Sequence, residues 1–134
     1  MASIVQVEGI GEAYAERLKA AGIRTTDALL EAGATAKGRK EIEEKTHIAH
    51  SLILEWVNHV DLWRLKGVAE EYSDLLEEAG VDSIPELAQR RADNLFEKLV
   101  AVNQEKQLVR RLPTQAQVAN WIEQAKALPR IVTH

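Results

Sequence analysis

The sequence contains no cysteine, and this absence excludes disulfide bonds and thiolate metal sites. It also has no apolar run that approaches the ~18 residues of a membrane-spanning helix. Its opening residues, MASIVQVEG, have neither the basic segment nor the apolar segment of a signal peptide. We therefore expect a cytoplasmic protein that does not contact a membrane.

The motifs of the common catalytic sites are also missing. The sequence has no Gly-rich phosphate loop of the Walker type, no nucleophile elbow and no H-E-x-x-H zinc motif. Glu55 and His59 stand four residues apart, a spacing that can hold a metal, yet no third ligand is evident nearby. We expect both side chains to be solvated, and we predict no enzymatic activity, no metal and no cofactor.

The residues that are present are typical of an ordinary globular chain. Of the 134 residues, 46% are hydrophobic and 28% are charged, which suits one compact domain or two very small ones. The net charge of −4 counts against a dedicated nucleic-acid domain, because such domains are usually basic.

The chain repeats itself. Residues 7–33 match residues 65–91 at an offset of 58, with seven identities in 27 positions and no gap. A later match has an offset of 65 and aligns Ile53, Trp56, Val57 and Val60 with Val118, Trp121, Ile122 and Ala125. The second copy therefore carries about seven extra residues, which we place within 102–113. We predict two units, residues 1–62 and residues 63–134.

Each unit has the pattern of four short helices. Tyr14, Leu18 and Ala21 form one apolar face that stops at Gly22, and Thr25 or Thr26 is suited to cap the next helix. Two further helices are expected over 36–46 and 49–62. In the second unit, Ser83 is suited to cap a helix, and Thr114 and Gln117 have the spacing of a capping box. Since no segment alternates like a strand, we predict an all-α fold of about eight short helices.

One short stretch, VEGIGEAYAERLKAAGI, places Gly9 and Gly11 on either side of Ile10, just before a helix. This pattern resembles the helix-hairpin-helix motif, in which the glycines permit backbone angles closed to other residues. The resemblance implies that Ile10 fills the core and that bare N–H groups at the helix start accept a phosphate oxygen. Arg17 and Lys19 are the cations nearby. We expect a positive φ at Gly11, so that Gly11→Val would be destabilising.

The resemblance extends beyond this turn. Residues 9–32, followed by KTHIAHSLILEWV, are similar to the paired helix-hairpin-helix domain of RecA-like recombinases and, less closely, to the C-terminal domain of the RNA polymerase α subunit. Over almost the whole chain, the sequence resembles an uncharacterised bacterial family, the domain of unknown function numbered 4332. The phrases LILEWVNHVDL and KLVAVNQEKQLVRRLP carry this likeness. It implies tandem helix-hairpin-helix units and no assigned activity.

The second unit departs from the glycine pattern. Its turn reads Lys66, Gly67, Val68 and Ala69, so the second glycine is gone. In the first unit, Glu12 offers a carboxylate where a phosphate would arrive. Two interpretations therefore stay open: a tight turn that serves folding alone, or a turn that binds phosphate.

Charge is sorted along the second unit. The acidic segment, Gly67 to Ala88, has seven acidic residues and no lysine or arginine, whereas Gln89 to the end has eight basic and four acidic residues. We define the basic group as Arg90, Arg91, Lys106, Arg110 and Arg111. The two stretches either pair internally or form a surface that docks a partner or another copy of the chain.

The sequence as a whole favours a non-enzymatic helix-hairpin-helix binding module. Its expected role is protein–protein interaction or a scaffold, with an unknown protein partner or self-association. The alternative is weak, sequence-independent binding of DNA or RNA backbone through the turn at Gly9, Ile10 and Gly11.

Overall fold

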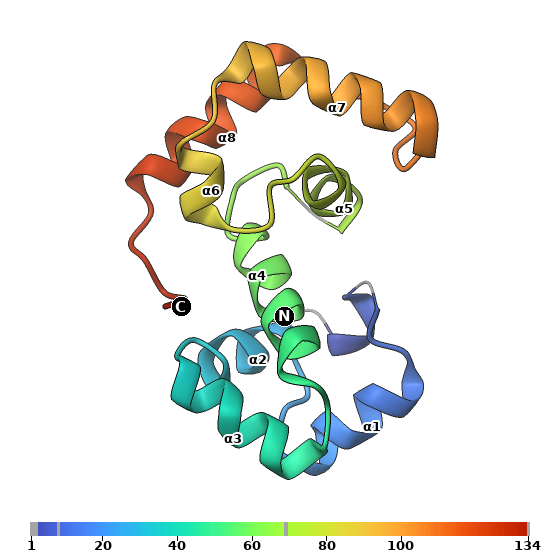
Figure 1. The fold of residues 1–134 in the computed structure, drawn as a ribbon, viewed down its shortest axis with the longest axis vertical. Helices are drawn as coiled ribbons and strands as arrows, with labels where there is room; N and C mark the ends of the chain where they lie inside the picture. Colours follow the sequence, from blue (N-terminus) through green and yellow to red (C-terminus); the bar gives the residue numbers. More distant parts are fainter. Residues whose placement is uncertain (1–2, 8, 69, 134) are drawn as a thin grey trace. The chain divides into compact units, whose positions relative to one another are not determined.

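The computed structural model describes residues 3–7, 9–68 and 70–133, and within them the fold is all-helical (Figure 1). These residues form eight α-helices and one short 3-10 helix, η1 (Ile4–Gln6), and no strand beyond an isolated bridge between Ser3 and Thr25. The predicted all-α fold of about eight short helices is confirmed.

The chain folds as two compact units, which we describe separately. Unit 1 comprises Met1–Asp61 and Arg130–His134, and unit 2 comprises Leu62–Pro129. The sequence-based division assigned residues 130–134 to the second unit. They belong with unit 1 because Thr133 N–H donates to the Ala34 carbonyl at 2.8 Å and the Arg39 guanidinium donates to the Thr133 carbonyl at 2.7 Å.

The helices of unit 1 follow η1 along the chain and are α1 (Glu12–Ala20), α2 (Thr26–Ala32), α3 (Ala36–Thr46) and α4 (His50–Leu62). The last residue of α4, Leu62, is the first residue of unit 2. Thr25, rather than Thr26, caps α2 through a bond from Ala28 N–H at 3.1 Å. Helix α1 ends in a Schellman motif: Gly22 has φ +88°, and Ile23 N–H donates to the Leu18 carbonyl at 2.8 Å. The core of unit 1 includes Ile4, Ile10, Leu18, Leu29, Ile42, Ile53 and Trp56.

The helices of unit 2 are α5 (Glu70–Glu78), α6 (Ile84–Ala88), α7 (Ala92–Lys106) and α8 (Gln115–Ala127). Ser83 caps α6, and Thr114 with Gln117 forms the predicted capping box at the start of α8. The loop between α7 and α8 covers residues 107–114, whereas α3 and α4 are joined by residues 47–49 alone. The additional residues of unit 2 therefore lengthen α7 and this loop.

The two units contain matching contacts. The Tyr14 ring lies 5.3 Å from the Trp56 ring, and the Tyr72 ring lies 5.3 Å from the Trp121 ring, with interplanar angles of 58° and 50°. Both tryptophans are buried. An inward tyrosine thus packs on the buried tryptophan of the last helix in each unit, an arrangement that aromatic rings favour.

Candidate functional site

The glycine turn, Gly9–Gly11, is formed by one left-handed residue and one extended residue. Gly9 has φ +91°, and Ile10 is 4% exposed, as the sequence predicts for a residue that fills the core. Gly11 is the N-cap of α1, with φ −82° and ψ 179°. The expected positive φ at Gly11 is therefore wrong. An N-cap residue adopts extended angles, so the left-handed step falls on Gly9.

This geometry predicts unequal effects on stability for the same substitution at the two glycines. A Cβ at Gly9 would lie 3.1 Å from Trp56 Nε1, whereas a Cβ at Gly11 would have nothing within 4 Å. We expect Gly9→Ser to lower the free energy of unfolding by about 1–2 kcal/mol, because a left-handed residue with a Cβ is strained. Gly11→Ser should change it by no more than about 0.5 kcal/mol, because serine is a good N-cap. Urea unfolding of both variants checks this, and equal losses would contradict it.

The charges near the glycine turn do not converge on it. Glu12 lies in the first turn of α1, while Arg17 and Lys19 lie in the last. At a rise of about 1.5 Å per residue, these cations begin about 8 and 10 Å farther along the helix. The Arg17 guanidinium lies 5.8 Å from the centre of the Tyr14 ring. The first turn of α1 therefore carries a carboxylate, whereas both cations lie farther along the helix.

The corresponding turn in unit 2 is held by a side chain. Gly67 has φ +90°, Val68 is buried and Lys66 is exposed; Ala69 lies outside the described residues. The Gln124 amide accepts a hydrogen bond from Lys66 N–H at 2.8 Å and donates one to the Lys66 carbonyl at 3.2 Å. The N–H and the carbonyl of Lys66 are therefore both hydrogen-bonded within unit 2.

The predicted basic group is not brought together. Arg90 and Arg91 precede α7, Lys106 ends it, and Arg110 and Arg111 lie in the loop that follows. A helix of 15 residues is about 22 Å long, so α7 separates the two subsets. The five residues therefore form two small clusters at opposite ends of one helix.

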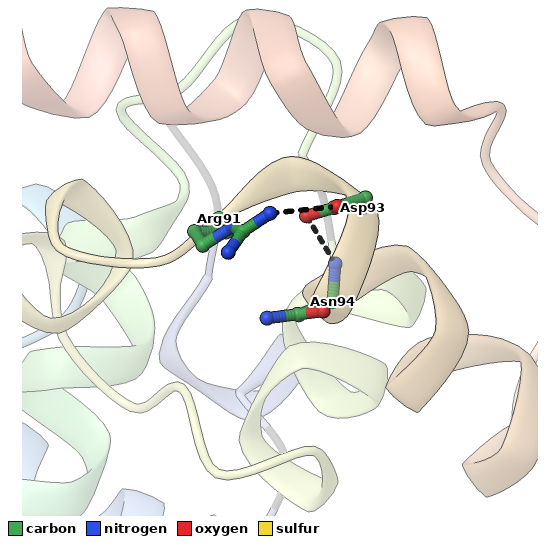
Figure 2. A network of polar contacts seen from close by, with 3 residues as sticks. All are labelled: Arg91, Asp93 and Asn94. Carbon is green, nitrogen blue, oxygen red and sulfur yellow. Dashed lines mark hydrogen bonds and ion pairs between the residues drawn. The ribbon is translucent and has the colours of Figure 1, made fainter.

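The first cluster is partly neutralised by its own helix (Figure 2). Arg91 Nη2 lies 3.1 Å from Asp93 Oδ2, and Asp93 Oδ1 accepts the Asn94 N–H at 2.8 Å. The bond from Asn94, with the charge of Arg91, lowers the pKa of the Asp93 carboxyl. An open depression of about 470 Å³ next to these residues also contains Lys126 and Glu123, which pair at 3.3 Å. Its mixed charges do not select an anionic ligand.

The second cluster has one internal pair. Lys106 Nζ lies 2.5 Å from Glu78 Oε2, and this hydrogen bond raises the pKa of Lys106. Arg110 and Arg111 are exposed, and within the described part of the chain their guanidinium groups have no ion pair or hydrogen bond. Leu112, which follows them, is 37% exposed. We call Arg110, Arg111 and Leu112 the arginine tip.

The loop that carries the arginine tip is fixed to unit 2. The Asn103 amide accepts from Val109 N–H at 3.0 Å and donates to the Val109 carbonyl at 3.1 Å. The Tyr72 hydroxyl donates to the Arg111 carbonyl at 2.9 Å, and Val109 is buried. The sequence pattern indicated the arginines but not Asn103 or Leu112, since the roles of these two residues depend on a loop conformation that has no local sequence signal.

The sequence-based expectation for His59 is wrong. Its side chain is 3% exposed rather than solvated. The stretch of α4 from Trp56 to Leu62, about two helical turns, is buried at every position, so none of its residues faces open solvent. Glu55, one residue before it, is exposed as expected.

The chain is a small all-helical protein of two units over its described residues. The model of one family, described as a domain of unknown function (DUF4332), matches residues 8–128, and the chain belongs to this family. Neither a curated protein nor a solved structure matches the chain. No helix in the described ranges is both long and apolar enough to cross a membrane.

Proposed function

We propose that this chain is a non-enzymatic protein-interaction or scaffold module, made of two helix-hairpin-helix units in tandem. The tandem arrangement is supported by the left-handed glycines Gly9 and Gly67, with φ +91° and +90°, and by the matching Tyr–Trp pairs. The absence of catalytic motifs from the sequence supports a binding role rather than an enzymatic one.

The arginine tip carries this proposal. Two exposed arginines, which have no ionic partner among the described residues, stand beside an exposed leucine on a loop held by Asn103 and Tyr72. Arginine is enriched at protein interfaces, and a loop that is already ordered loses little conformational freedom on binding. The tip therefore suits a partner with an acidic surface and a small apolar contact.

Charge reversal at the tip tests the proposed interaction. We expect Arg110→Glu with Arg111→Glu to leave the circular dichroism spectrum unchanged and to weaken partner binding at least about tenfold, since close interfacial charge pairs contribute about 1.5–7 kcal/mol. Partners are captured from a cell extract, and affinity is then measured with each purified partner.

A matched control changes the same number of charges elsewhere. Lys37 and Lys40 are exposed on α3, and their double reversal to glutamate alters the net charge equally. Partner binding should survive this control. Equal loss in both double variants would assign the effect to net charge and reject the arginine tip as the interface.

The second candidate function is weak binding of nucleic-acid backbone at the glycine turn. Its support is the start of α1, where Gly11 caps the helix without a side chain and leaves room for a phosphate oxygen. Against it stand Glu12 in the first turn and the distance to Arg17 and Lys19.

A DNA titration separates the two candidates. We expect any binding of duplex or single-stranded DNA at low salt to collapse at physiological salt, because only phosphates would be contacted. Fluorescence anisotropy with labelled oligonucleotides of unrelated sequence measures this. Submicromolar binding that persists at physiological salt would make nucleic acid the better proposal.

A further inference from the structure

The C-terminal segment, residues 130–133, follows unit 2 in the chain but belongs to unit 1. It has no helical structure. Val132 is 2% exposed, and Thr133 N–H donates to the Ala34 carbonyl at 2.8 Å. A segment of four residues at the end of the chain therefore docks through a buried side chain and its backbone.

Arg39 forms the centre of the docking site. Its side chain is 2% exposed, and the guanidinium donates to the Gly33 carbonyl at 2.8 Å and to the Thr133 carbonyl at 2.7 Å. Burial lowers the pKa of Arg39, yet an arginine stays charged in proteins. No carboxylate pairs with it among the described residues. Since a buried charge needs hydrogen-bond partners, Arg39 depends on a backbone carbonyl supplied by the C-terminal segment.

An open depression lies beside this segment. Ile131 is 38% exposed and borders an apolar depression of about 300 Å³ together with Asp27, Leu30, Glu31 and Ala34. Backbone hydrogen bonds combined with a pocket for one side chain are the means by which proteins recognise extended peptides. Unit 1 therefore has the contacts of a peptide-binding groove, occupied by the chain's own end.

We propose that this groove also accepts the C-terminal segment of a second copy, so that the chain associates by exchanging these segments. An exchanged segment would make the same bonds to Arg39 and Ala34 and bury the same valine. Exchange of an identical element is a low-cost route to association, because it replaces each contact by its equivalent. The segment is also short and non-helical, and the Thr133–Ala34 bond is the one backbone–backbone hydrogen bond between residues 130–133 and the rest of the described chain, so its release disturbs little of the remaining backbone.

Two complementary variants of the full chain test the exchange. Val132→Asp disrupts the segment and leaves the groove unchanged. Arg39→Met disrupts the groove and leaves the segment unchanged. We expect each variant alone to be monomeric by sedimentation, and an equimolar mixture to form a heterodimer. The double variant, which has neither part, should not pair with either one. A mixture that stays monomeric up to about 1 mM would overturn the proposal.

A synthetic peptide tests whether the groove binds a second copy of the chain or only a free peptide. The synthetic peptide PRIVTH, residues 129–134, is added to the Val132→Asp chain. Binding of the peptide supports the groove, provided that the heterodimer also forms. Peptide binding without a heterodimer would show that the groove takes peptides but not a second copy, and would reject the exchange.

Hydrogen exchange in the unaltered chain tests release of the segment without any substitution. The Thr133 amide, bonded to the Ala34 carbonyl, should exchange at least about tenfold faster than the Leu29 amide in the core, because only local opening is required. Equal protection would mean that the segment leaves only when unit 1 unfolds. Unfolding of unit 1 by Val132→Asp would likewise show that the segment cannot leave a folded unit 1. Either result overturns the proposal.

Discussion

Trp121→Ala is expected to lower the free energy of unfolding of unit 2 by about 3–5 kcal/mol, the range for removing a buried tryptophan. The side chain is 2% exposed, packs on Tyr72 at 5.3 Å, and belongs to the same core as Leu76 and Leu99. Since small domains are stable by only about 5–15 kcal/mol in total, this loss would bring unit 2 close to unfolding at room temperature. Urea unfolding followed by far-ultraviolet circular dichroism measures the change.

Trp121→Phe is the matched control. Phenylalanine keeps an aromatic ring against Tyr72 and fills part of the same volume, so we expect less than half the loss seen with alanine. A loss below about 1 kcal/mol for Trp121→Ala would contradict the assignment of Trp121 to the core of unit 2.

Gly38→Ala should destabilise unit 1 by about 2–3 kcal/mol, although alanine is the better helix former by about 1 kcal/mol. A Cβ at Gly38 would lie 2.1 Å from the Ala32 carbonyl oxygen and 3.3 Å from its carbon. Both atoms belong to the backbone, so the end of α2 would have to move away from α3. The overlap therefore outweighs the gain in helix propensity, and thermal or urea unfolding measures the net loss.

Asn94→Ala provides the control for this position. Asn94 is the third residue of α7, as Gly38 is of α3, and its side chain is exposed. We expect a change within about 0.5 kcal/mol, as for other exposed substitutions. A stabilising effect of Gly38→Ala would show that α2 and α3 can separate at little cost, and would reject the close approach as a constraint on the fold.

The sequence by itself determined the local structure. The caps at Ser83 and Thr114, a cap at either Thr25 or Thr26, the stop at Gly22 and the inward face of α1 could be assigned, because each depends on residues within one or two turns of a helix. The same local signals gave the number of helices, and the extra residues of the second unit were expected where the longer α7 and its loop occur.

Only the tertiary structure decided how distant residues meet. The φ at Gly9 and the approach at Gly38 depend on what the chain packs against, and Gly11 looked equivalent to Gly9 in the sequence. The length of α7 divides the basic group into two clusters, although spacing along the chain suggested one surface. Arg39 is buried because the C-terminal segment, more than 90 residues later, supplies the carbonyl that its charge requires, and no local pattern indicates this contact.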